Sequence, residues 1–226
     1  MTLDVTAAPS PNFNDRKVPI SLILLHYTGM ENGAAAIARL RDRDAQVSAH
    51  YVIEENGHIL QLVGEDKRAW HAGVASWRGE ADVNSASIGI EIVNGGHDFG
   101  LPDYPARQIE SVIALVRDLM ERHGLGPERV IGHSDVAPGR KQDPGEHFPW
   151  ASLTAAGCAL ACPPAPEGAA SRDPGEDLVR IGYSLEPGLA AVVEAFQRRW
   201  RPALCDGVLD EECRALIAAI AHHHAC

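Results

Sequence analysis

The sequence predicts an α/β fold, with a mixed central β-sheet flanked by helices and a small three-helix domain at the C-terminal end. A near-continuous apolar run at residues 20–25 is typical of a strand buried on both faces of a sheet, and residues 87–93 alternate as a further strand. Apolar residues recur at helical spacing over residues 105–123. A Pro/Gly-rich segment, residues 158–176, precedes a further helical region.

This pattern divides the chain into three parts. We expect one α/β domain with an N-terminal arm over residues 1–157, a linker over 158–176 and a three-helix domain over 177–226. A chain of 226 residues has room for one medium-sized domain and one small domain.

The overall charge and hydropathy exclude some partners. The formal net charge is −11, which argues against nucleic acid and anionic membranes, because their phosphates attract Lys/Arg patches. No apolar run approaches the length of a membrane span. Residues 1–17 lack the basic start and apolar core of a signal peptide, and no lipidation cysteine lies near them, so we expect a cytoplasmic protein. The oligomeric state is not predicted.

The five cysteines are an odd number, which suggests free thiols in a protein without an export signal. Cys158 and Cys162 would share a helix face, and His222–His224 stand near Cys226. A second metal site at either place is a weaker alternative to buried thiols and solvated tail histidines.

The first half of the chain reads as strands and one short helix. Residues 1–19 are polar and contain prolines, and we expect them to wrap the domain as an arm. The run at residues 20–25 is the first strand, and the Ala-rich residues 33–43 form a short helix. Residues 47–54 and 58–63 are a hairpin around Asn56-Gly57, a strong turn signal.

The strand at residues 87–93 carries an acidic side chain in its middle. Period-two alternation places Glu91 on one face with Gly89, and Ile88, Ile90 and Ile92 on the other. A carboxylate flanked by isoleucines must be paired or functional, and Gly89 would leave room for a substrate or metal. The helix at 105–123 follows and ends at Gly124, before a strand end at 129–131.

Residues 130–144 then lose hydrophobic periodicity and become a Gly/Pro-punctuated loop that carries His133, Lys141 and Asp143. Catalytic zinc takes three protein ligands, and His26, which ends the first strand, offers the third. If the two strands are neighbours, both imidazoles reach one pocket. A pair of hydrogen-bonded structural histidines is the alternative.

Five segments in this order resemble the type 2 N-acetylmuramoyl-L-alanine amidase family, which includes peptidoglycan recognition proteins and phage amidase lysozymes. The segments are LLHYTGM, VSAHYVI, AWHAG, SIGIEIVN and GHSDVAPGRKQDPG, within about residues 20–150. The resemblance implies Zn²⁺ bound by His26, His133 and Asp143. It also implies Glu91 as the catalytic carboxylate and Lys141 as the catalytic lysine.

The implied reaction is hydrolysis of the amide between the muramoyl lactyl group and L-Ala of peptidoglycan or muropeptides. Glu91 would accept a proton from the attacking water, and Lys141 would stabilise the oxyanion. We expect five further residues to contact the substrate, although a structural role is the stronger reading for His50 and a core role is as plausible for Trp70. The five are Tyr27, His50, Trp70, His71 and Asn94.

The C-terminal region contains a second, more moderate resemblance. The segments IGYSL, AFQRRW and CDGVLDEECRALI are similar to a small three-helix peptidoglycan-binding domain. About 50 residues are marginal for independent stability, so we expect this region to pack on the amidase domain. Phe196 and Trp200 belong to the helix face assigned to the core. A purely structural extension is the alternative.

Two rival functions remain open. A recognition module that binds peptidoglycan without cutting it typically lacks a zinc ligand, whereas all the implied site residues are present here. A cytoplasmic recycling amidase restricted to 1,6-anhydro-muropeptides fits the missing signal peptide. That subgroup, however, has arginines near the positions of Gln46 and Asp82 and lacks the added C-terminal region, so we favour broader specificity.

Overall fold

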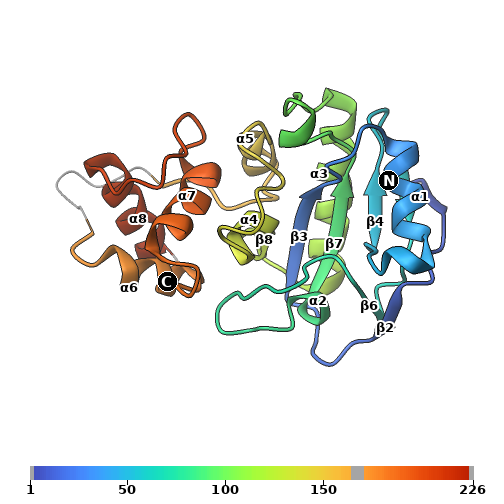
Figure 1. Ribbon diagram of the computed structural model, residues 1–226, viewed down its shortest axis with the longest axis horizontal. Helices are drawn as coiled ribbons and strands as arrows, with labels where there is room; N and C mark the ends of the chain where they lie inside the picture. The colour runs from blue at the N-terminus through green and yellow to red at the C-terminus, as the bar shows by residue number, and fades with distance from the viewer. Residues whose placement is uncertain (1–2, 164–170, 224–226) are drawn as a thin grey trace.

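A mixed six-stranded sheet forms the centre of the molecule, with helices on both faces (Figure 1). The structure is a computed structural model that describes residues 3–163 and 171–223. The strand order is β1-β5-β4-β7-β3-β8, and only β4 and β5 pair antiparallel. The predicted α/β class is therefore confirmed. The strands of this sheet are β1 (Val5–Ala7), β3 (Leu22–Tyr27), β4 (Tyr51–Ile53), β5 (Ile59–Gln61), β7 (Ser87–Ile92) and β8 (Val130–Gly132).

The two central strands, β3 and β7, are buried because both faces of the sheet are covered. Leu25 and Ile90 point to the face covered by α3 (Ala106–His123), where they pack with Val112. This helix is long and amphipathic, and it ends as predicted at Gly124 in a left-handed conformation. Leu24 points to the opposite face. Alternation along β3 and β7 therefore places His26 and Glu91 on the face away from α3.

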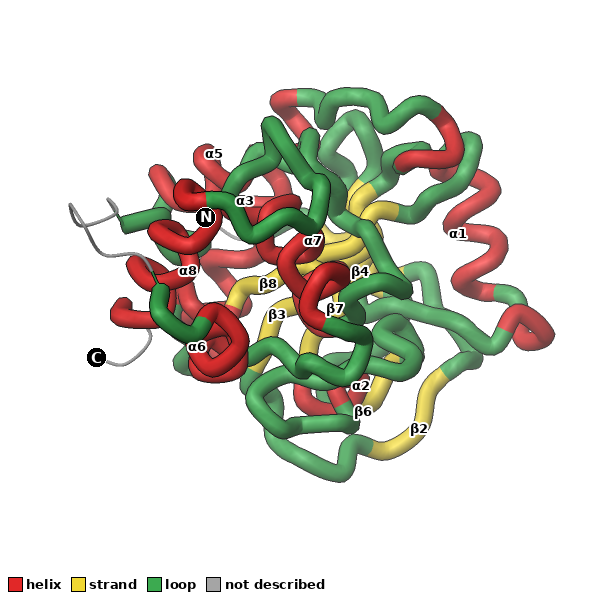
Figure 2. Tube along the Cα trace, turned by 60° about the vertical axis from the view of Figure 1, so that its left-hand side comes forward, coloured by secondary structure: helices red, strands yellow, loops and turns green. Residues whose placement is uncertain are grey.

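The N-terminal arm is more regular than its polar composition predicts. Strand β1 extends the main sheet by pairing with β5, and β2 (Phe13–Asp15) pairs antiparallel with β6 (Lys67–Ala69) in a second, two-stranded sheet. Figure 2 shows β2 and β6 below the main sheet. Because β2 pairs with β6, the N-terminal arm lies next to the segment that follows β6.

Apart from α3, the helices before the C-terminal region are short. They are α1 (Gly33–Arg41), α2 (Val83–Ala86), α4 (His133–Val136) and α5 (Trp150–Ala155), with single 3-10 turns at Arg43–Ala45, His97–Phe99 and Pro127–Arg129. The segment after β8 was expected to be a loop throughout, but it begins with one helical turn, α4, which starts at His133.

Three C-terminal helices gather beside the β8 edge of the sheet: α6 (Pro174–Ile181), α7 (Leu189–Trp200) and α8 (Glu211–His223) (Figure 1). They share a single apolar cluster with the sheet, since Leu24 and Ile131 belong to the same cluster as Phe196 and Ile217. None of the described helices is long and apolar enough to cross a membrane.

A buried ion pair also joins these helices to the sheet. The Asp135 carboxylate accepts hydrogen bonds from the Tyr183 hydroxyl at 2.5 Å and from Nη1 of Arg199 at 3.1 Å. Nη2 of Arg199 donates to the carbonyl of Val130. The guanidinium lies over the rings of both Trp150 and Trp200, at 4.3 and 4.8 Å from their centroids. The C-terminal helices thus hold both ends of β8 and the turn that carries His133.

Candidate active site

Strand register brings the predicted site residues together. His26 on β3 lies opposite Glu91 on β7, and Leu25 lies opposite Gly132 on β8. His133 follows Gly132 directly, so both histidines stand at the carboxyl ends of neighbouring parallel strands. Ligands commonly bind at this edge of an α/β sheet.

Three potential metal ligands converge there. Nδ1 of His26 and Nδ1 of His133 lie 2.9 Å apart, and each lies 2.9 Å from Oδ2 of Asp143. All three side chains are buried. Among residues 3–163 and 171–223, these are the one group of three His, Cys, Asp or Glu side chains whose ligand atoms all lie within 4.8 Å. The two alternative metal sites at the cysteines and the C-terminal histidines do not form such a group within that range, and His224 and Cys226 lie outside it.

The tautomer of His133 follows from the hydrogen-bond partner of its second ring nitrogen, Nε2. Nε2 of His133 lies 2.9 Å from the carbonyl oxygen of Ala72. A carbonyl can only accept a hydrogen bond, so Nε2 carries the proton. In the neutral ring, Nδ1 therefore presents a lone pair toward His26 and Asp143.

A similar chain of hydrogen bonds fixes His26. The Ser87 hydroxyl donates to the carbonyl of Val83, and its oxygen lies 3.5 Å from Nε2 of His71. If Nε2 of His71 donates to Ser87, Nδ1 of His71 accepts from Nε2 of His26, which is 3.0 Å away. Burial, followed by the proximity of His133, lowers the pKa of His26 to about 4, so the ring is neutral near pH 7.

In these tautomers, two imidazole lone pairs and a carboxylate oxygen face one another. Such a group of acceptors is stabilised when a cation lies between them. Two histidines and one carboxylate form a ligand set typical of catalytic zinc. The residues present thus fit a metal ion on the chemistry of their donor atoms.

Glu91 lies beside these ligands but does not belong to them. Its Oε2 is buried and has no hydrogen-bond partner among the described residues. Burial raises the pKa of Glu91 well above its ordinary value, and the Asp143 carboxylate adds to this effect, while Lys141 opposes it. A carboxylate with a raised pKa next to a candidate metal site is suited to accept and return a proton.

A cavity of about 530 Å³ opens at this edge of the sheet. Its wall includes the three candidate ligands, Glu91, Lys141 and Tyr27, and helix α7 contributes to it as well. The lining residues are His26, Tyr27, Thr28, Gly29, His71, Glu91, Asp98, His133, Gly139, Arg140, Lys141, Gln142, Asp143, Ala191, Glu194 and Arg198.

The five residues expected to contact substrate divide into two groups. Tyr27 and His71 line this cavity, and Trp70 lines an adjoining cavity of about 200 Å³ next to α1. His50 and Asn94 line neither cavity. His50 is fully buried, with Nδ1 accepting from the amide of Gly89, and Asn94 is bound to backbone groups of its own loop.

Gly89 has a different role from the one expected. A Cβ built at this position would lie 2.5 Å from the ring of His71. The space beside Glu91 is therefore filled by His71 rather than left open for substrate or metal. The absence of a side chain at residue 89 lets His71 reach Nε2 of His26.

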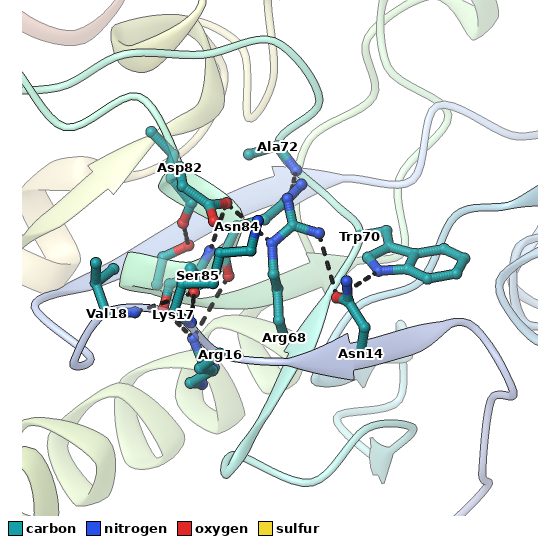
Figure 3. A network of polar contacts seen from close by, with 12 residues as sticks. Asn14, Arg16, Lys17, Val18, Arg68, Trp70, Ala72, Asp82, Asn84 and Ser85 are labelled. Atoms are coloured by element: carbon teal, nitrogen blue, oxygen red, sulfur yellow. Dashed lines mark hydrogen bonds and ion pairs between the residues drawn. The ribbon is translucent and has the colours of Figure 1, made fainter.

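The segment that supplies His71 and Ala72 is held by the N-terminal arm and α2. Figure 3 shows the polar network around it. Oδ1 of Asn84 accepts the backbone N–H groups of both His71 and Ala72, at 2.9 and 2.7 Å. The indole of Trp70 donates to Asn14 on β2 at 3.0 Å (Figure 3). Sequence reasoning predicted the arm but missed Asn84, the role of the Ala72 carbonyl and the contact of the arm with Trp70, because these contacts are backbone-mediated or long-range.

Asp82 caps α2 and accepts a hydrogen bond from Nε of Arg68 at 2.9 Å (Figure 3). Gln46 is exposed. Neither position supplies an arginine to the cavity.

Comparison with known proteins agrees with this arrangement. A family model described as N-acetylmuramoyl-L-alanine amidase matches residues 16–146. The N-acetylmuramoyl-L-alanine amidase AmiD of Escherichia coli (strain K12) is 36% identical over 231 residues, covering 89% of this chain and 82% of that protein. The 1,6-anhydro-N-acetylmuramyl-L-alanine amidase AmpD of the same strain is 42% identical over 117 residues, covering 52% of this chain and 59% of that protein.

Solved structures give the same result over nearly the whole chain. E. coli AmiD in complex with anhydro-N-acetylmuramic acid-L-Ala-D-gamma-Glu-L-Lys superposes with a TM-score of 0.81 at 34% identity, covering 90% of this chain and 89% of that one. AmpDh3 from Pseudomonas aeruginosa, in complex with anhydromuramic pentapeptide, gives a TM-score of 0.83 at 34% identity, covering 91% and 92%.

Proposed function

The chain belongs to the N-acetylmuramoyl-L-alanine amidase family, and on this premise we propose that it cuts muropeptides at a zinc centre formed by His26, His133 and Asp143. The bond hydrolysed is the amide between the muramoyl lactyl group and L-Ala. The observation that carries the proposal is the convergence of three potential ligand atoms beside Glu91, whose buried Oε2 has no partner among the described residues.

When bound, zinc supplies a Lewis acid that polarises the scissile carbonyl and increases the acidity of water. The protein's own contribution begins with orientation. Ala72 and His71 accept the outer N–H groups of the two histidine ligands, so both rings keep Nδ1 toward the site.

Glu91 is proposed as the proton carrier. Its carboxylate takes a proton from the attacking water and then returns it to the nitrogen of the leaving L-Ala residue. The raised pKa of Glu91 favours the second step, because burial stabilises the protonated form of the carboxyl group. No serine or cysteine nucleophile is needed.

Lys141 is proposed to stabilise the negative charge that develops on the carbonyl oxygen. It lines the same cavity as Glu91 and Asp143. A fixed ammonium in a partly enclosed site stabilises an oxyanion more than it would in water.

The proposed substrates are muropeptides that include, but are not restricted to, the 1,6-anhydro form. Both solved relatives described above hold anhydro-muramic ligands. AmiD, which matches 89% of this chain, is not named for the anhydro form, whereas AmpD of E. coli matches 52% of it. A recognition module without activity is disfavoured because the ligands, Glu91 and Lys141 are all in place.

One experiment tests the proposal. The purified protein is incubated with a muramoyl tripeptide and with its 1,6-anhydro counterpart, and the products are identified by mass spectrometry. We expect free tripeptide with an L-Ala N-terminus from both, and bound zinc at one equivalent. His133→Ala should lose zinc and activity, whereas His147→Ala, at an exposed histidine, should keep both. A fully active protein without metal would contradict the proposal.

A further inference from the structure

Helix α7 belongs to the active-site cavity, although it lies more than 45 residues beyond Asp143 in the sequence. Ala191, Glu194 and Arg198 line the cavity together with the candidate metal ligands. These residues are spaced by three and four along the helix, so they present one face to it. The C-terminal region therefore forms part of the wall that a substrate meets.

The two charged residues on this face, Glu194 and Arg198, differ in exposure and in how far their polar atoms are already hydrogen-bonded. The Arg198 side chain is 6% exposed, with Nη2 donating to Oε1 of Glu194 at 2.8 Å and Nε donating to Oε2 of Glu146 at 3.3 Å. Arg198 is thus occupied by two carboxylates and is poorly placed to receive a third from a substrate. Glu194 is 40% exposed, and its Oε2 has no hydrogen bond within the described part of the chain.

A chain of polar contacts fixes this arrangement to the strand that carries His26. The Tyr27 hydroxyl lies 2.9 Å from Nδ1 of His97, and Nε2 of His97 lies 3.0 Å from Oε2 of Glu146. Glu146 holds Arg198, and Arg198 holds Glu194. The Glu194 carboxylate is therefore oriented before a substrate binds, which reduces the entropy lost when it forms an ion pair.

We propose that Glu194 is a specificity-determining residue that binds an ammonium group on the stem peptide of the substrate. This inference rests on the proposed function, because it concerns the same cavity. The muropeptide bound to the AmiD relative ends in L-Lys, so an ammonium is present in ligands of this class. The enzyme should therefore favour stem peptides whose third residue is a diamino acid.

The test compares two substrates that differ in one charge. They are muramoyl-L-Ala-D-γ-Glu-L-Lys and the same compound with norleucine, which keeps the carbon chain of lysine and lacks the amine. We expect the wild-type protein to favour the lysine substrate by about 3- to 10-fold in kcat/KM, as for a partly exposed ion pair. The preference should appear mainly in KM, because the contact is remote from the reacting atoms.

Four variants locate the effect. Glu194→Gln should remove the preference by slowing cleavage of the lysine substrate alone. Glu194→Asp, which keeps the charge but shortens its reach, should leave a smaller preference. Asp98→Asn removes another carboxylate of the cavity, and Glu110→Gln removes an exposed one on α3; both should keep the wild-type ratio.

Three results would overturn the inference: equal losses on both substrates in Glu194→Gln, an unchanged ratio in that variant, or loss of the preference in Asp98→Asn. A wild-type protein that cuts both substrates at the same rate would also overturn it, while leaving the proposed amidase activity intact. Cleavage of neither substrate by zinc-loaded wild-type protein would overturn the proposed function, and this inference with it.

Discussion

At the scale of single residues, the site depends on atoms that do not touch the metal position. His26 and His133 each have one ring nitrogen facing Asp143 and one facing a protein acceptor. The outer acceptor decides which nitrogen is left unprotonated, and therefore whether the ring can act as a ligand. His71 is thus better understood as a positioning residue for His26 than as a substrate contact.

His71→Phe tests this role. The phenyl ring keeps the packing against Gly89 but leaves Nε2–H of His26 without an acceptor in a buried site. We expect zinc affinity to fall by about 10- to 100-fold, as for other residues that orient a ligand. His71→Asn is the matched control, because its amide oxygen can take the place of Nδ1. Chelator competition measures the affinity, and wild-type affinity in the phenylalanine variant would refute the role.

Glu91→Gln separates the chemical step from metal binding. The amide keeps the shape of the side chain but cannot accept the proton of the attacking water. Turnover should fall by roughly two to four orders of magnitude, the usual contribution of general acid–base catalysis. Zinc content should stay the same, because Glu91 is not proposed as a ligand. Kinetics and metal analysis of one preparation check both points, and loss of zinc would show that Glu91 has been misassigned.

At the scale of elements, one carboxylate ties a strand to the end of the long helix. Glu65 accepts hydrogen bonds from Tyr51 on β4 and from Arg122 and His123 in the last turn of α3. Burial would raise the pKa of Glu65, but these three hydrogen bonds outweigh burial and lower it to about 2. The carboxylate therefore stabilises the folded state while it remains ionised.

The sign of the pH effect follows from this lowered pKa. The contribution of Glu65 is fully present above its unfolded pKa near 4.5 and is lost as the pH falls toward 2. Glu65→Gln should reduce stability by about 1–2 kcal/mol at neutral pH, allowing for screening at the exposed Arg122. This corresponds to roughly 2–6 °C in Tm. Thermal unfolding of wild type and Glu65→Gln at pH 7 and at pH 3 should show a smaller difference in Tm between the two proteins at pH 3. An equal difference in Tm at both pH values would contradict this role of Glu65.

The spacing of apolar residues in the sequence was sufficient to predict the longest helix and strands. The spacing over residues 105–123 predicts α3 to within one residue, and the apolar run before His26 predicts β3. Alternation over residues 87–93 also gives the correct orientation, with Ile90 toward α3. Local pattern alone settles these elements because one face of each is uniformly apolar.

Other elements depend on contacts that a local pattern does not contain. Strands β1 and β2 are three residues each and exist because β5 and β6 offer free edges. The turn α4 follows a strand in a polar segment, where Asp135 accepts the backbone N–H of Gly132. The position of α7 beside the candidate metal ligands required the tertiary fold, since no spacing in the sequence relates Glu194 to Asp143.

At the scale of the whole molecule, the sheet and the C-terminal helices are joined by charge as well as by apolar contact. Arg199→Met leaves Asp135 buried with one partner fewer, which should cost about 3–5 kcal/mol. Adding Asp135→Asn should restore part of this loss, because no uncompensated charge then remains. Denaturant unfolding of both variants measures the difference, and equal stability of the single and double variants would contradict a buried ion pair.

Removal of residues 171–226 tests whether the C-terminal helices form a separable module. An independent anchor would leave cleavage of small soluble muropeptides intact and weaken only action on insoluble peptidoglycan. The structure predicts the opposite, because deletion exposes the apolar cluster around Leu24 and Ile131, frees Asp135 beside His133 and removes the α7 wall of the cavity.

We therefore expect the shortened protein to lose cooperative unfolding or at least 10 °C in Tm, on the order expected when a large apolar interface is removed. Activity should fall on soluble and insoluble substrates alike. Arg199→Met, which retains α7, provides the comparison for destabilisation without loss of the cavity wall. Thermal unfolding, zinc analysis and rates on both substrates give the answer. A folded, zinc-loaded fragment with full activity on soluble muropeptides would show that the C-terminal helices are dispensable for the chemistry.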